Sequence, residues 1–80
     1  MTDYYQKIHN RESTLEQKIR RKVREINDHV SAGKPCYWDA AQKRRRVFRA
    51  RMSKGKFQVM PLAGQKWLEA SLDDHFEFYR

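Results

Sequence analysis

The sequence predicts a small α+β domain in which helices pack on a two- or three-stranded antiparallel sheet. Three observations support this class. Residues 13–32 repeat apolar side chains at helical spacing, residues 45–62 alternate apolar with other side chains around a glycine-containing turn, and helical spacing returns from residue 65. Because an amphipathic helix buries its apolar stripe against such a sheet, we expect a long N-terminal helix, a central hairpin and a C-terminal helix.

Length and charge restrict the function classes. Eighty residues make one domain, 1–80, and Lys and Arg outnumber Asp and Glu by 18 to 10, a formal net charge of +8. A field of this sign attracts polyanions. The one cysteine, Cys36, cannot form an internal disulfide, which fits a reducing compartment, and no apolar run has the length of a signal-peptide core or membrane span. We therefore expect a cytoplasmic protein, or a nuclear one in a eukaryotic host, with no membrane partner.

The first helix has recognisable signals at both ends. Ser13 and Glu16 form a capping box, Gly33 suits the position after the last turn, and Pro35 prevents continuation. Residues 1–12 form either a frayed arm or an extension of this helix, because apolar side chains four apart continue its spacing. The apolar stripe consists of Leu15, Ile19, Val23, Ile26 and Val30. The arginines on the opposite face each have an acidic residue four positions away, which indicates a solvated surface.

Two interpretations remain open for residues 36–42. Cys36 to Trp38 are strand-favouring residues, and the following residues can turn into the next strand. Alternatively, Asp39 and Gln42 form a second capping box that starts a short helix. We favour the strand.

The hairpin, at about 45–62, has one apolar and one basic face. Phe48, Ala50 and Met52 are predicted on the apolar face, whereas Val47 and the alternating arginines lie opposite. After a turn at 53–56, in which Gly55 supplies a positive φ, the apolar face continues through Phe57, Val59 and Pro61. Proline cannot donate to a ladder, so the second strand lies at an edge or ends there.

Between Asp39 and Glu69 the sequence has no acidic residue, so the cations of the hairpin lack local partners. Their mutual repulsion is relieved by an external anion, and arginine forks onto phosphate oxygens. The alternative is a charged edge that prevents strand aggregation. The predicted nucleic-acid-binding residues are Lys43, Arg44, Arg45, Arg46, Arg49, Arg51, Lys54 and Lys56.

Two aromatic groups carry secondary hypotheses. Tyr37 and Trp38 could stack on an exposed base, although an aromatic pair beside a hairpin is more commonly core. Phe76, Phe78 and Tyr79, on an acidic C-terminal helix, could dock a protein partner; alternatively this helix only balances the charge of the hairpin.

The sequence shows no catalytic or metal signature. Its three histidines and Cys36 have no zinc-ligand spacing, and no phosphate loop or nucleophile motif is present. Asp73, Asp74 and His75 are adjacent, so on a helix they point in different directions. We expect no enzyme activity, metal, cofactor or small-molecule substrate.

The order of elements resembles known nucleic-acid-binding folds. With a strand at 36–38, the order α-β-β-β-α resembles double-stranded-RNA-binding domains, but residues 63–66 contain one cation where those domains carry a basic signature. With a helix from Asp39, it resembles a winged-helix DNA binder or an excisionase-type factor. We therefore expect an accessory or regulatory protein that binds DNA or RNA through phosphate contacts. The alternative is an inhibitor or adaptor that occupies a nucleic-acid groove or acidic surface of a larger enzyme complex.

Overall fold

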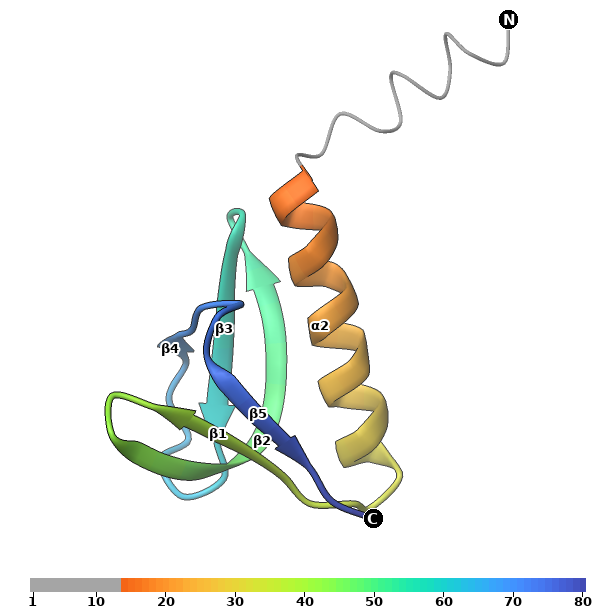
Figure 1. The fold of residues 1–80 in the computed structure, drawn as a ribbon, viewed down its shortest axis with the longest axis vertical. Helices are drawn as coiled ribbons and strands as arrows, with labels where there is room; N and C mark the ends of the chain where they lie inside the picture. Colours follow the sequence, from red (N-terminus) through yellow and green to blue (C-terminus); the bar gives the residue numbers. More distant parts are fainter. Residues whose placement is uncertain (1–13) are drawn as a thin grey trace, which may run out of the picture.

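The computed structural model describes residues 14–80, which form one helix and a five-stranded antiparallel sheet (Figure 1). The elements are α2 (Thr14–Ser31), β1 (Cys36–Ala40), β2 (Lys43–Ser53), β3 (Lys56–Pro61), β4 (Leu68–Glu69) and β5 (His75–Phe78). The strand order is β4-β3-β2-β1-β5, so the last strand returns to pair with the first. The α+β class is confirmed, but the sheet has more strands than predicted. The expectations for residues 1–12 and for Ser13 lie outside the described residues.

Helix α2 packs along β2 (Figure 1), and most side chains of the predicted apolar stripe contact the core. Ile19 and Ile26 are buried, and Val23 and Val30 pack against the same core. Leu15, in the first turn of the helix, is 58% exposed, so the buried part of the stripe begins at Ile19. On the helix surface Lys22 Nζ contacts Glu25 Oε1 at 3.0 Å, so Glu25 pairs with a lysine three positions earlier and not with the arginine four positions earlier.

The helix ends as predicted. Gly33 has φ +79°, and its N–H donates to the Val30 carbonyl at 2.9 Å. The N–H of Lys34 donates to the His29 carbonyl at 3.2 Å. These two bonds form a Schellman motif, which needs a left-handed residue where glycine has no Cβ penalty.

Residues 36–42 form a strand and a turn, so the alternative helix from Asp39 is wrong. Ala41 and Gln42 both have positive φ, at 53° and 58°, and connect β1 to β2 directly. Two consecutive left-handed residues match the twist of a two-residue hairpin. The second hairpin turn is equally tight: Lys54 and Gly55 have φ 53° and 74°. The positive φ expected at Gly55 is therefore confirmed.

Strand β2 belongs to two half-sheets and bends between them. Its first residues pair with β1, its later residues pair with β3, and the register shifts between Val47 and Arg49. A bulge of this kind reverses the alternation of side chains. Val47 is therefore buried and Phe48 is 46% exposed, opposite to the predicted faces. Beyond the bulge, Ala50, Phe57 and Val59 are buried as predicted, and β3 ends at Pro61.

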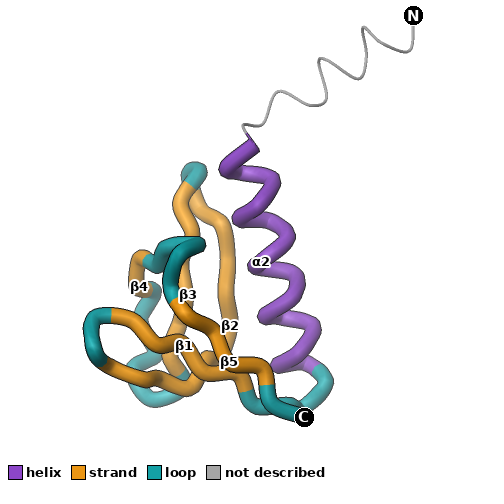
Figure 2. Tube along the Cα trace, viewed as in Figure 1, coloured by secondary structure: helices purple, strands orange, loops and turns teal. Residues whose placement is uncertain are grey.

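The prediction of a C-terminal helix is wrong. Residues 63–80 form turns and the short strands β4 and β5, which appear as separate strand segments joined by loops in Figure 2. Asp74 fixes the turn between them, because its Oδ2 accepts from the Ser71 N–H at 2.8 Å and from the Trp38 indole at 3.0 Å. Consequently neither predicted order, α-β-β-β-α or two helices and a hairpin, describes residues 14–80.

A side chain from α2 occupies the edge of β2 that β1 leaves unpaired. Asn27 Nδ2 donates to the Ala50 carbonyl at 2.9 Å, and Asn27 Oδ1 accepts from the Ala50 N–H at 2.8 Å. The amide thus satisfies both backbone groups of one residue, as a neighbouring strand would. Asn27 therefore sets the position of the helix along the sheet as well as closing its edge.

Cys36 lies in the core beneath α2, at 0% exposure, opposite Phe78 of β5. Burial, followed by the nearby Glu25 carboxylate, raises the pKa of the Cys36 thiol to about 11. The neutral thiol is therefore favoured in the fold.

This burial predicts a pH-dependent stability. An unfolded thiol ionises near pH 8.5, so between this value and 11 the unfolded chain binds fewer protons and stability falls as pH rises. Between pH 8 and 10.5 the wild-type free energy of unfolding should fall by about 2 kcal/mol more than that of Cys36→Ala. Urea titrations of both proteins at the two pH values measure this difference. Equal pH dependence would contradict it.

Candidate nucleic-acid interface

The predicted binding residues lie on β2, on the turn that follows it and at the start of β3, but the bend in β2 divides them into two groups. Those before the bulge lie next to β1, and those after it lie next to β3. The first group contains Lys43, Arg44, Arg45 and Arg46, and the second contains Arg49, Arg51, Lys54 and Lys56. The eight residues therefore do not form one continuous face.

A groove of about 680 Å³ lies between the first half of β2 and the segment 61–68. Its cations are Lys43, Arg44, Arg45, Arg46 and Lys66, and its apolar part comes from Pro61, Leu62, Ala63 and Leu68. The Leu62 N–H donates to the Arg46 carbonyl at 2.8 Å, which joins the two segments. We refer to this feature as the basic groove.

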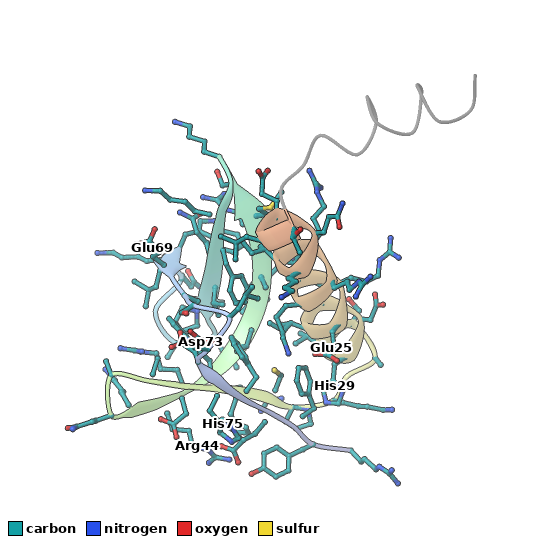
Figure 3. All side chains as sticks on the ribbon, turned by 45° about the horizontal axis from the view of Figure 1, so that its top comes forward. Glu25, His29, Arg44, Glu69, Asp73 and His75 are labelled. Atoms are coloured by element: carbon teal, nitrogen blue, oxygen red, sulfur yellow. The ribbon has the colours of Figure 1, made fainter. Side chains whose placement is uncertain are left out.

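Within residues 14–80, Arg44 is the member of the basic groove that has a carboxylate partner. Its Nε donates to Glu77 Oε1 at 2.8 Å, and its Nη2 donates to the Tyr79 hydroxyl at 2.7 Å. Its guanidinium lies 4.0 Å from the centre of the Tyr37 ring. Figure 3 labels Arg44 of β2 and His75 of β5, which lie on the two strands that flank β1, both opposite Asp39. Strand β5 thus supplies the partner that the local sequence lacks, so the expectation of an unpaired cation is wrong at Arg44.

The same cluster shifts three ionisation equilibria in directions that keep the pair charged. Hydrogen bonds from Tyr79 and from Arg44 lower the pKa of Glu77. The bond to Glu77 raises the pKa of Arg44 and also that of Tyr79. Arg44 therefore remains cationic but is already paired with the Glu77 carboxylate.

In the described chain, the other cations of the basic groove are not paired with a carboxylate. The guanidinium of Arg45 lies 5.3 Å from the centre of the Trp38 ring. Within residues 14–80, no ion pair involves Lys43, Arg45, Arg46 or Lys66. Four positive side chains without a counter-charge therefore surround one apolar groove.

The two stacking candidates differ in burial. Trp38 is 3% exposed, stacks on Phe76 with 6.5 Å between ring centres, and donates to Asp74. A buried indole cannot offer a face to a base, so stacking does not fit Trp38. Tyr37 is half-buried, and its ring is covered by Arg44 and by the edge of Tyr79.

The second basic group lies on the outer face of the β2–β3 hairpin. Arg51 Nε donates to Gln58 Oε1 at 2.8 Å, and its guanidinium lies 4.1 Å from the centre of the Trp67 ring. Lys56 is 3.7 Å from Glu69 of β4, with both side chains about two-thirds exposed (65% and 66%). Such an exposed pair contributes little stability, but it gives Lys56 a partner that the sequence did not predict. Lys54 and Arg49 are exposed.

The candidate docking aromatics are mostly packed within the domain. Phe76 and Phe78 pack against the core, and the His29 ring meets Phe78 edge-on with 5.2 Å between ring centres. Tyr79 is 43% exposed, but its hydroxyl donates to Glu77 at 2.6 Å. Protein docking at these residues stays a prediction.

Sequence reasoning left Lys66 out of the binding set and missed Trp67 and Glu77. Lys66 lies in the stretch without acidic residues, so it could have been added to the binding set from the sequence alone. The roles of Trp67 and Glu77 depend on β4 and β5 returning to the sheet. A C-terminal helix would have placed both elsewhere.

No protein-family model, curated protein or solved structure matches this chain. In residues 14–80, no group of three or more His, Cys, Asp or Glu side chains is arranged to hold a metal ion. Within the same range, no helix combines the length and apolar character needed to cross a membrane.

Proposed function

We propose that this protein is a non-enzymatic nucleic-acid-binding accessory or regulatory protein that holds phosphates in the basic groove. The observation that supports this most strongly is the set of four cations, Lys43, Arg45, Arg46 and Lys66, around one groove without a carboxylate partner in the described chain. Close like charges repel one another, so an anion placed among them stabilises the fold as well as the complex. Phosphate oxygens suit both the guanidinium forks and the ammonium groups.

The apolar part of the basic groove supports a nucleotide chain over free phosphate. Pro61, Leu62 and Leu68 line the groove beside the cations, and Leu62 is 46% exposed. Nucleic-acid sites combine a cationic path for the backbone with apolar surface for sugars and bases. Because phosphate contacts carry no sequence information, this groove supplies affinity, and any base preference comes from elsewhere.

A salt titration tests the proposal. Binding of a labelled 20-nucleotide strand and of the matching duplex is measured by fluorescence anisotropy from 50 to 400 mM salt. If the four unpaired cations each meet a phosphate, the slope of log K against log salt should be roughly −3 for the strand and −4 for the duplex. A slope near zero for both would overturn the proposal.

A pull-down from lysate treated with nuclease separates the alternative function. A partner protein that stays bound in stoichiometric amount after nuclease treatment, together with salt-independent binding of oligonucleotides, would favour an adaptor that occupies a protein surface. Loss of the captured material on nuclease treatment supports nucleic-acid binding.

A further inference from the structure

Arg51 and Trp67 form a cation–π pair on the outer face of the β2–β3 hairpin. The Arg51 guanidinium lies 4.1 Å from the centre of the Trp67 ring, which is the separation of a cation–π contact. Gln58 Oε1 accepts from Arg51 Nε at 2.8 Å and so fixes the orientation of the guanidinium. Arg51 and Gln58 are opposite each other in the β2–β3 register, which places both on one face.

Arg51 resembles Arg44 in its aromatic contact but differs from it in having no ion pair within the described chain. Both guanidinium groups lie on aromatic rings, at 4.0 Å for Arg44 and 4.1 Å for Arg51. Arg44 is neutralised by two contacts with Glu77. Arg51 has no ion pair with any residue of the described chain, and its side chain is exposed. An aromatic ring therefore covers one face of Arg51 while its charge remains uncompensated.

A purely structural role explains only part of this arrangement. The pair connects β2 to the segment before β4, which strengthens a short and exposed strand. Such a connection does not need a charged group, since the apolar side chain of Leu or Met would also pack on Trp67. The guanidinium plane, oriented by Gln58, instead presents a planar surface to solvent.

Trp67 of this pair is adjacent in the chain to residues of the basic groove. Lys66 lines the groove, and the next residue in the chain is Trp67. Trp67 therefore lies between two residues that line the groove, Lys66 and Leu68. Bases stack on aromatic rings and on arginine planes only when they are not already stacked within a duplex.

We propose that the Arg51–Trp67 pair is a stacking platform for an unpaired nucleobase, so that the preferred ligand is a single strand. This inference rests on the proposed function and adds the form of nucleic acid that is recognised. Every base has a π face, so the platform gives preference for single strands without strong preference for sequence.

An abasic oligonucleotide provides the test, because it keeps the phosphates and removes the bases. The probes are a 12-nucleotide thymidine strand and an abasic strand of equal length and charge. Wild-type protein should bind the thymidine strand about tenfold more tightly than the abasic strand. In Arg51→Lys, which keeps the charge but loses the plane, the ratio should fall to about threefold or less.

Lys54→Gln is the matched control, since Lys54 is an exposed cation of the same hairpin with no described aromatic contact. It should weaken binding of both strands by the same factor and leave their ratio unchanged. Equal affinity of wild-type protein for both strands, with the salt dependence intact, would overturn the platform but not the phosphate groove. Failure to bind either strand would overturn the proposed function itself. Circular dichroism confirms that each variant is folded.

Discussion

Replacing Lys43 and Lys66 together with glutamate should weaken nucleic-acid binding by about 100-fold. Both side chains line the basic groove, are exposed, and have no ion pair within residues 14–80. Glutamate at these positions places two carboxylates against the phosphates, so the loss combines missing attraction with direct repulsion. Anisotropy measurements with one labelled strand at fixed salt give the two dissociation constants.

The matched control is a double substitution away from the groove. Lys18→Glu with Lys34→Glu alters the net charge by the same −4, from +8 to +4, at exposed positions on and just after α2. Only the long-range field changes in this variant, so its loss should stay below about fivefold at physiological salt, where the Debye length is about 8 Å. Equal losses in the two variants would show that net charge, and not the groove, determines binding.

Substituting Asn27 with alanine should destabilise the fold by about 2–3 kcal/mol. The change removes two hydrogen bonds and leaves the N–H and carbonyl of Ala50 without partners at a part-buried edge. The higher helix propensity of alanine offsets only about 0.5 kcal/mol of this. Urea unfolding, followed by circular dichroism, measures the change in free energy.

Gln17→Ala is the control for the Asn27 variant, because it removes an amide from an exposed position of the same helix. Its effect should stay within about 0.5 kcal/mol. Hydrogen exchange gives a local measurement: the Ala50 amide should lose protection in Asn27→Ala more than amides of the β1–β5 pair. Unchanged protection at Ala50 would contradict the edge-closing role of Asn27.

Local signals predicted the helix and the second hairpin correctly. The apolar spacing of Ile19 and Ile26 and the glycine at 33 are sufficient to define the buried face and the end of α2. Lys54-Gly55 between two strand-like segments identifies the hairpin. The bulge near Phe48 has no comparable signal. A one-residue shift in register there exchanges the faces of Val47 and Phe48.

The C-terminal segment shows why periodicity failed. Leu68, Leu72 and Phe76 are spaced as on a helix, but Phe76 and Phe78 also alternate with Glu77 as on a strand. Tertiary contacts determine that this segment is a strand and not a helix. Trp38 lies opposite Phe76, and the Trp38 indole donates to Asp74. Sequence periodicity reports only local spacing, so it does not predict contacts with residues that are distant in the sequence. For the same reason the contacts of Arg44 with Glu77 and Tyr79 could not be predicted in advance.

The return of β5 to β1 has a consequence for folding during synthesis. The β2–β3 hairpin pairs residues that are close in sequence, whereas β1 pairs with a strand almost forty positions later. Contacts at such separation form late and slow the reaction. Until residue 78 has left the ribosome, β1 exposes one unpaired edge, and Trp38 lacks both Phe76 and Asp74. A nascent chain stalled before that point therefore presents an aromatic strand edge to which chaperones bind and at which chains aggregate.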